Sequence, residues 1–194
     1  MRVTLCLVVV VVAATSGCEE DCNTVEPGYA GDASDEVWRV MIEARSLATE
    51  GDDAASVTDP TEGAELSQGD NAAFTWDSPL QTALVTPSSS SKTRRALAPG
   101  LLDLLSQAVF PRAHAHLPPV TSDVHLLEID VPGRTCPVAG LTTNQTFVFD
   151  EASWEKITSD PGERTLRIMS AFLTENRVTE GPFLAAPVTF TVKE

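Results

Sequence analysis

Three histidines lie close together in the sequence and are the side chains best suited to hold a metal ion. They are His114, His116 and His125. Histidines at positions i and i+2 of an extended chain point the same way, so His114 and His116 can share one ion. His125 belongs to the next predicted strand, and three imidazoles together suit Zn²⁺ or Cu²⁺. In the alternative interpretation His114 and His116 are exposed loop residues, and His125 is half-buried at the end of an apolar strand face.

Nucleophilic catalysis finds little support in the sequence. GxSxG, HExxH and Walker-type glycine motifs are all missing. Ser89 and Lys92 fit the letters of an SxxK motif, but its companion motifs are missing and the surrounding serine run is typical of a linker. We therefore predict that the protein is not an enzyme. A small hydrolase with an unrecognised site is the weaker alternative, because a spatial triad leaves no fixed sequence spacing.

The N-terminus has the pattern of an export signal. Arg2 is followed by a stretch from Val3 to Ala14 that is apolar except for Thr4, and then by small residues. This length and these flanks indicate a secretory signal peptide over residues 1–17 rather than a membrane-spanning helix. A buried N-terminal strand is the alternative.

Ser16-Gly17-Cys18, directly after the apolar run, resembles the lipobox of bacterial lipoproteins. The resemblance implies that Cys18 becomes the mature N-terminus and carries lipid, and acyl chains then hold the protein on a membrane. Thr15 departs from the pattern because Leu is usual there, so ordinary secretory cleavage near residues 15–17 stays open. Glu19 stands where an inner-membrane retention signal has Asp, which implies the outer membrane or cell surface of the bacterial envelope.

The remaining cysteines suggest one disulfide. Cys6 leaves with the signal and Cys18 is used if it is lipidated, which leaves Cys22 and Cys136 as a pair in an oxidising compartment. The alternatives are two unpaired thiols, or a bond between Cys18 and Cys22 in an unlipidated chain. Neither spacing resembles a cysteine zinc knuckle.

The charge balance excludes some partners. The whole chain carries 13 basic and 28 acidic residues, and removal of Arg2 with the signal leaves 12 − 28 = −16. Nucleic-acid binding depends on Lys and Arg that neutralise phosphates, so we expect no nucleic-acid partner. A small basic cluster, Lys92, Arg94 and Arg95, suits a solvated loop better than a site for an acidic partner.

Hydrophobic periodicity divides the mature chain in two. Residues 18–59 read as an acidic tether containing a helix at 34–49, where apolar residues recur at helical spacing and Ser34 can cap the start. Residues 60–194 read as strands of period two, at 64–68, 72–76, 125–131, 147–149, 166–172 and 188–192. An insertion at 78–122 interrupts them and contains a short amphipathic helix at 101–109.

The strand segments resemble immunoglobulin-like and fibronectin type III domains. The resemblance is carried by Pro60, Gly63, Leu66 and Phe74-Thr75-Trp76 at the start, and by 166–172, Asn176, Gly181-Pro182 and 188–192 at the end. It implies an antiparallel β-sandwich that serves as a binding or spacer module. The long insertion and the missing strand tyrosine depart from the family and leave the strand order open.

These observations predict a membrane-tethered extracytoplasmic lipoprotein that acts as a non-catalytic binding or structural module. Its partner would be a protein or a glycan, and its membrane contact would be the lipid on Cys18. The alternative is a metal-binding lipoprotein that uses His114, His116 and His125.

Overall fold

A computed structural model describes residues 22–80 and 118–193 of the chain. The described strands are β1 (Gly28–Ala30), β2 (Thr49–Glu50), β3 (Ser56–Asp59), β4 (Ala64–Ser67), β5 (Ala73–Asp77), β6 (Ser122–Asp130), β7 (Val138–Thr142), β8 (Thr146–Val148), β9 (Gly162–Thr174), β10 (Arg177–Leu184) and β11 (Val188–Lys193). The described helices are α1 (Asp35–Ala44) and α3 (Glu151–Thr158), and short 3-10 turns occupy Cys22–Thr24 and Arg45–Leu47. The expectation of a mainly β fold is confirmed.

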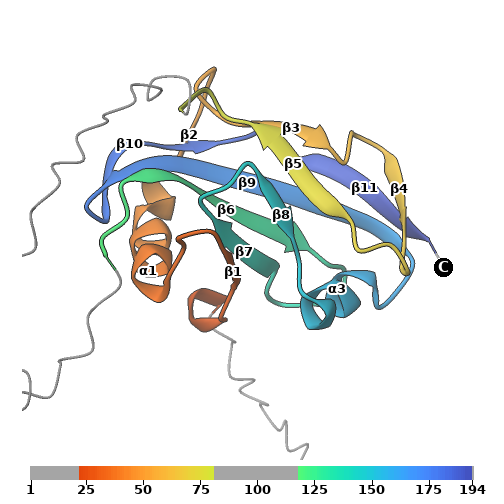
Figure 1. The fold of residues 1–194 in the computed structure, drawn as a ribbon. Coiled ribbons are helices and arrows are strands. Elements are labelled where there is room, and N and C mark those ends of the chain that lie inside the picture. Colours follow the sequence, from red (N-terminus) through yellow and green to blue (C-terminus); the bar gives the residue numbers. More distant parts are fainter. Residues whose placement is uncertain (1–21, 81–117, 194) are drawn as a thin grey trace, which may run out of the picture.

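The strands form two sheets (Figure 1). Sheet A has the strand order β1-β7-β6-β9-β10-β2. Strand β11 pairs with β9 on the same side as β10, and it also pairs with β4. Sheet B contains three antiparallel strands in the order β3-β5-β8. Most pairs are antiparallel, but β1 with β7, β2 with β10 and β4 with β11 are parallel. The described part of the chain is therefore a two-sheet structure with mixed edges.

Strands β6 and β9 form the centre of sheet A and are covered on both faces. Their antiparallel register pairs Ser122 with Leu173 and continues to Asp130 with Thr165. Successive side chains of a strand point to opposite faces. Leu127 and Ile129 therefore enter a core beneath sheet B, while Val124 and Leu126 enter a second core beneath α1. Both faces of β6 are accordingly buried without interruption from Asp123 to Leu127.

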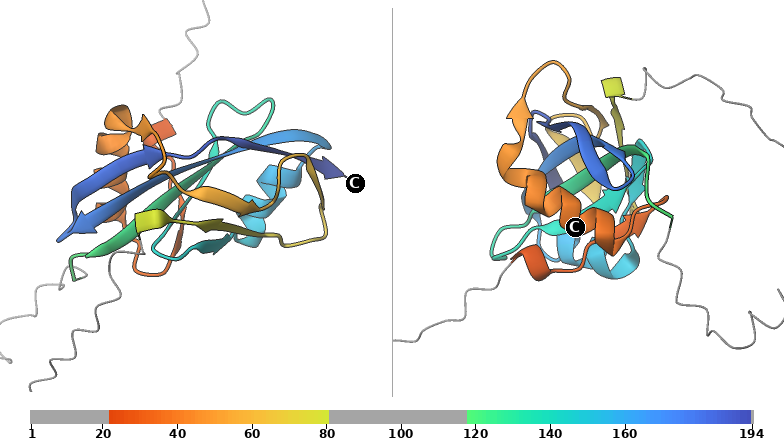
Figure 2. Two further views of the ribbon diagram at one scale, coloured as in Figure 1. Left: turned by 90° about the horizontal axis from the view of Figure 1, so that it is seen from above. Right: turned by 90° about the vertical axis from the view of Figure 1, so that its left-hand side faces the viewer.

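Helix α1 covers the outer face of sheet A (Figure 2). It forms where the sequence predicts it, because Ser34 Oγ accepts a hydrogen bond from the Val37 amide and two acidic residues occupy the first turn. Val37 and Met41, which are fully buried, pack against sheet A. The helix ends at Ala44 rather than at 49, because the chain tightens into a 3-10 turn and then joins sheet A as β2.

The segment predicted as a tether contributes to the domain from Cys22 onward. Strand β1 pairs with β7, α1 closes one core, and β3 forms an edge of sheet B. The Arg45 guanidinium forms an ion pair with Glu128 on β6 and fixes the end of α1 on the sheet. The domain thus begins before residue 60, since these elements obtain their pairing and burial from strands that follow much later in the chain.

Helix α3 follows β8 and buries Trp154 and Ile157 against the core. The Asp150 carboxylate caps its start by accepting a hydrogen bond from the Ser153 amide at 2.8 Å. At its other end the buried Arg164 side chain donates from Nε to the Ile157 carbonyl at 2.7 Å. Arg164 therefore satisfies a carbonyl in the last turn of α3 and joins this helix to the start of β9.

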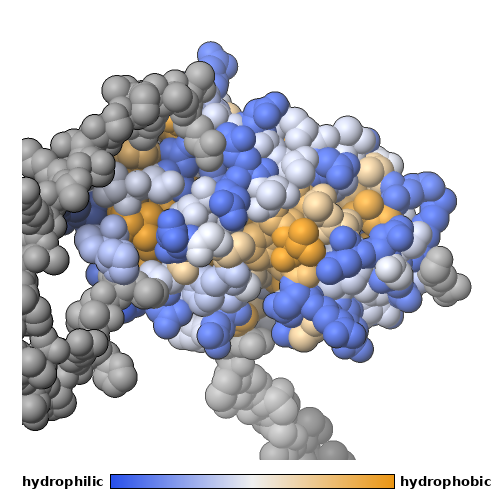
Figure 3. All heavy atoms as spheres, in the orientation of Figure 1, coloured by the Kyte–Doolittle hydropathy of each residue, from blue (hydrophilic) through white to orange (hydrophobic). Residues whose placement is uncertain are grey.

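The outer face of sheet B is largely polar. Thr58 and Thr75 share a hydrogen bond of 2.9 Å, and Thr146 lies next to Thr75 in the register. Val148 is 47 % exposed, and Figure 3 shows a hydrophobic area over β8 and β5 among hydrophilic surroundings. This face has the polar character of a solvated antiparallel sheet, with Val148 as one isolated exposed apolar side chain.

The described part of the predicted insertion consists of its two ends. Residues 78–80 continue from β5, residues 118–121 lead into β6, and Ser122 already belongs to that strand. The helix predicted at 101–109 lies outside the described residues.

Cys22 and Cys136 form a disulfide with an S–S distance of 2.01 Å across a sequence separation of 114. This is the pairing expected from the sequence. It joins the first described turn to the loop between β6 and β7, so the N-terminal segment is fixed to the domain where the described chain begins.

Replacing both Cys22 and Cys136 by Ser should lower the free energy of unfolding by about 4 kcal/mol, because the unfolded chain loses the constraint of a very long closed loop. Urea unfolding of the wild type and the double variant measures the difference. Reduction should destabilise the wild type by a similar amount and leave the double variant unchanged. Equal stability of all four samples would contradict this role.

Candidate functional site

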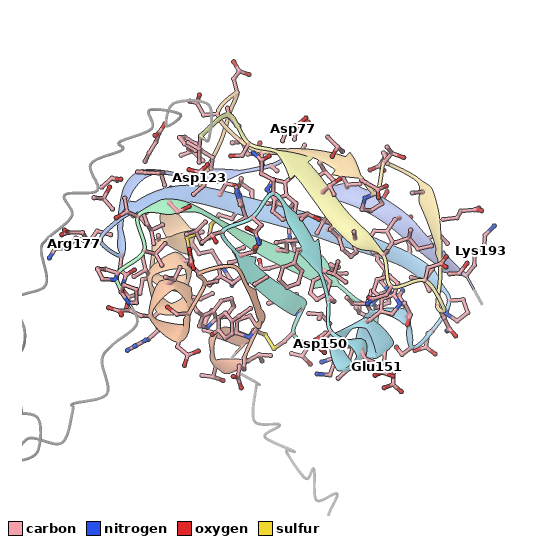
Figure 4. The ribbon with its side chains drawn as sticks, viewed as in Figure 1. Asp77, Asp123, Asp150, Glu151, Arg177 and Lys193 are labelled. Carbon is pink, nitrogen blue, oxygen red and sulfur yellow. A yellow bond between two sulfur atoms is a disulfide. The ribbon has the colours of Figure 1, made fainter. Side chains whose placement is uncertain are left out.

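The interior contains a group of polar side chains at one end of the sandwich, which we call the interior polar cluster. Its members are Trp76, Ser78, Asp123, His125 and Ser170, and none of them is more than 6 % exposed. Figure 4 shows Asp123 toward the end of the molecule that carries Arg177, whereas Lys193 lies at the opposite end. Buried polar groups are costly unless they are satisfied, so such a cluster is a candidate functional site.

Strand alternation places these residues together. On β6, Asp123 and His125 continue the inward face that Leu127 and Ile129 occupy further along. Ser170 is the register partner of His125 on β9. Trp76 belongs to the buried face of β5, and Ser78 lies two residues after it. The cluster thus joins both sheets where the apolar core ends.

His125 is held by two contacts. Its Nδ1 is 2.8 Å from the Ser170 hydroxyl oxygen, at hydrogen-bonding distance. Its ring meets the Trp76 ring edge-on, with centroids 5.1 Å apart and an interplanar angle of 69°. Burial lowers the pKa of His125 to about 3, so the imidazole is neutral at physiological pH.

Several polar atoms of the cluster have no hydrogen-bond partner within the described structure. They are His125 Nε2, Trp76 Nε1, Ser78 Oγ and both carboxylate oxygens of Asp123. Burial, reinforced by the negative charge of Glu180, raises the pKa of Asp123 to about 6. Each unsatisfied buried group costs roughly 1–3 kcal/mol. These atoms are therefore available to a bound species that offers them partners.

The cluster does not have the geometry of a catalytic triad. Ser170 and His125 are bonded, but no hydrogen bond links Asp123 to the imidazole among the described residues, so the carboxylate does not orient the ring. Ser170 is also fully buried, and a substrate carbonyl cannot approach its hydroxyl. The arrangement is suited to holding a small species rather than to acyl transfer.

The predicted histidine site is represented in the structure by His125 alone. His114 and His116 lie outside the described residues, and so does Cys18. Within residues 22–80 and 118–193, His, Cys, Asp and Glu side chains form no group of three or more that could hold a metal ion. The three-histidine site stays a prediction.

A second feature is a surface pocket of about 300 Å³ at the end of the sandwich where residues 118–122 enter sheet A. It is lined by residues 31–33 and 118–122. The turn between β9 and β10 fixes one side of it, because Asn176 Oδ1 accepts a hydrogen bond from the Val120 amide at 2.6 Å and the Glu175 amide donates to Thr121 Oγ1 at 3.0 Å. We call this surface the insertion end.

The sequence interpretation missed Asp123, Ser78 and Ser170. The signal for Asp123 was present, because it continues the alternation of His125, Leu127 and Ile129 by two positions and so predicts a carboxylate on a core face. Ser78 and Ser170 gave no comparable signal, since a single serine at a strand end or within an apolar strand has many structural roles. Among the described residues, no helix has the length and apolar character to cross a membrane.

Asp123→Asn should remove a pH dependence of stability. Between about pH 4 and pH 6, folded Asp123 stays protonated while the same group in the unfolded chain ionises, so wild-type stability falls as the pH rises through this window. The stability of Asp123→Asn relative to wild type should therefore increase by up to about 3 kcal/mol from pH 4 to pH 7.5.

Urea unfolding across this pH range, with a chelator present, measures the effect. The matched control is Asp77→Asn, which changes an exposed carboxylate at the end of β5. A difference between Asp123→Asn and wild type that stays constant with pH would contradict the buried, unpaired carboxylate.

Comparisons with protein-family models, with curated proteins and with solved structures find no match to this chain.

Proposed function

We propose that this chain is a lipid-tethered extracytoplasmic lipoprotein whose domain is an immunoglobulin- or fibronectin type III-like sandwich with a binding function. The observation that carries the proposal is the disulfide between Cys22 and Cys136. Structural disulfides persist in oxidising compartments. The bond lies directly after an apolar N-terminal segment of the kind that directs export, so two independent features agree on an extracytoplasmic location.

The strand allocation supports the sandwich assignment. In immunoglobulin-like domains the first, second and fifth strands share one sheet, and the central strands of the other sheet are the third, sixth and seventh. Here β3, β5 and β8 share sheet B, while β6, β9, β10 and β11 belong to sheet A. Two strands depart from the plan: β7, in the place of the fourth strand, pairs with β6 in sheet A, and β4 pairs with β11. Helix α1 and the short strands β1 and β2 are additions to that plan, and the segment between β5 and β6 is its long insertion.

The disulfide also favours a short tether. Three residues separate Cys18 from Cys22, and Cys22 is bonded to the loop between β6 and β7. A lipid on Cys18 would therefore hold this loop close to the membrane. Only a few extended residues at about 3.3 Å each would separate the acyl chains from the folded domain. The domain would be held close to the membrane and limited in its orientations.

The insertion end is the proposed binding surface. Long connections on a rigid sandwich commonly carry recognition, and here the pocket of about 300 Å³ lies beside the residues where the longest connection re-enters the sheet. The hydrogen bonds of Asn176 and Glu175 to residues 120–121 keep this surface ordered. The partner would be a protein or a glycan of the cell envelope.

A non-catalytic role is supported by the burial of the hydrogen-bonded Ser170 and His125 pair. Within residues 22–80 and 118–193 this pair has the arrangement of a nucleophile and its base, and both residues are fully buried. Their hydrogen bond therefore satisfies two buried polar groups and does not act on a substrate.

Cys18→Ser should release the protein from the membrane, because the lipidated thiol is the proposed anchor. The measurement is detergent-phase partitioning and the intact mass of protein isolated from its own cells. Wild type should have the mass of residues 18–194 plus acyl groups and should gain two hydrogens on reduction. Cys6→Ser is the matched control and should leave both readouts unchanged. An unmodified, soluble wild-type chain would refute the tether.

A photo-cross-linking amino acid at Pro119 should capture a partner at the insertion end in living cells, since Pro119 is exposed and lines the pocket. The control position is Lys193, which is exposed at the opposite end of the molecule (Figure 4). A defined adduct at 119 and none at 193, identified by mass spectrometry, is the expected result. Equal adducts at both positions would contradict a binding surface at this end.

A further inference from the structure

A pocket of about 370 Å³ lies directly after the first cysteine of the disulfide, and we call it the tether pocket. It is lined by residues 23–27 together with Tyr29, Asp35, Trp38 and Arg39. We propose that the tether pocket binds the phosphoethanolamine headgroup of a phospholipid in the membrane that holds the protein. The inference rests on the lipid tether proposed above and names the membrane component that the folded domain contacts.

The chain geometry holds the tether pocket close to the acyl chains. Cys22 precedes the first lining residue, Asn23, and its bond to Cys136 fixes it on the domain. Four residue steps join Cys18 to Cys22, so these two residues lie at most about 14 Å apart. Figure 1 shows the turn at Cys22–Thr24 beside α1, which supplies the other wall of the pocket. A lipid on Cys18 therefore keeps the pocket within reach of neighbouring headgroups.

Arg39 supplies the group that a phosphate needs. It is exposed on α1 and lines the pocket. Within residues 22–80 and 118–193 its guanidinium forms no ion pair, and its hydrogen bond there runs from Nε to the Asp35 carbonyl at 3.5 Å. The two terminal nitrogens can therefore donate to two phosphate oxygens, which is the geometry in which arginine binds phosphate most strongly.

Two carboxylates on the same pocket suit the ammonium group of ethanolamine. Glu26 and Asp35 both line the pocket and are exposed. The Tyr29 hydroxyl donates to Asp35 Oδ1 at 2.7 Å and so holds this carboxylate in place. Burial, together with the hydrogen bond to Asp35, raises the pKa of Tyr29, so the hydroxyl keeps its proton. The Tyr29 ring adds aromatic surface, which attracts ammonium groups.

The charges of the lining favour a zwitterion over an anion. One arginine and two carboxylates line the pocket, so a headgroup with a phosphate and an ammonium finds a partner for each charge. An anionic headgroup such as that of phosphatidylglycerol would meet Arg39 but would be repelled by Glu26 and Asp35. Surfaces that bind anionic lipids are polybasic, whereas this chain has 13 basic and 28 acidic residues. Phosphatidylethanolamine is therefore the lipid that fits the pocket.

The test is titration of the detergent-extracted full protein with water-soluble headgroups, followed through the amide NMR signals of residues 23–39. The probes are glycerophosphoethanolamine, glycerophosphoglycerol and inorganic phosphate. We expect glycerophosphoethanolamine to bind with a Kd on the order of 1 mM, which suffices because the tether supplies a high local concentration of headgroups. The other two probes should bind more weakly by roughly 10-fold or more, since each leaves the carboxylates without a cation.

Two single variants separate the two halves of the headgroup. Arg39→Gln should weaken glycerophosphoethanolamine binding by roughly 10-fold or more, and Glu26→Gln by roughly 3-fold, because each removes one charged partner. Both side chains are exposed, so neither substitution disturbs the core. Arg177→Gln is the matched control and should bind like the wild type, since Arg177 is exposed and does not line the pocket.

Lipidated wild type in vesicles tests the membrane itself. Amide hydrogen exchange of residues 23–39 should be slower by roughly 3-fold or more in vesicles that contain phosphatidylethanolamine than in vesicles that contain phosphatidylglycerol instead. Arg39→Gln should abolish this difference, and Arg177→Gln should keep it.

Four results would each overturn the proposal. They are equal affinity for inorganic phosphate and glycerophosphoethanolamine, wild-type affinity in Arg39→Gln, no saturation below about 10 mM, and equal exchange rates in the two kinds of vesicle. The titration does not depend on the lipid, whereas the tether is judged by the partitioning and mass of wild type and Cys18→Ser. Failure of the headgroup site is therefore distinguishable from failure of the tether.

Discussion

The antiparallel pairing of β6 with β9 is the constraint on which the rest of the structure depends. Nine consecutive register pairs, from Ser122–Leu173 to Asp130–Thr165, fix which side chains face each layer. A shift of one residue would turn every side chain of β6 to the other face. Val124 would then leave the core beneath α1, and Leu127 would leave the core beneath sheet B. Helix α1, sheet B and the interior polar cluster all take their positions from this register.

Much of this frame could be predicted from the sequence because the signals are local. The period-two segments at 166–172 and 188–192 lie within β9 and β11, the segment at 125–131 overlaps β6 up to Asp130, and the helical spacing near Val37 falls in α1. The contribution of residues 22–59 to the sheets could not be predicted in the same way. Strands β1 and β2 have three and two residues, which is too short for a periodic pattern, and their existence depends on β7 and β10 far along the chain.

The candidate site shows the same division between local and distant information. His125 attracted attention because His114 and His116 are near it in sequence, yet the groups around it in space are Ser170, 45 residues later, and Trp76 from the other sheet. Only the register brings these together. The alternation of β6 predicts that Asp123 lies on the core face. Only the structure shows that its carboxylate is buried and lacks a hydrogen-bond partner.

The disulfide and the interior polar cluster have opposite effects on stability. Unsatisfied groups on Asp123, His125 and Ser78 cost roughly 1–3 kcal/mol each, a sum comparable with the net stability of many domains. The bond from Cys22 to Cys136 contributes about 4 kcal/mol through the unfolded state, without touching the cluster. A domain stabilised by this disulfide can tolerate unsatisfied polar side chains in its interior. In a chain of this size without the disulfide, selection would favour leucine or valine at those positions. That balance favours a role for the cluster other than packing.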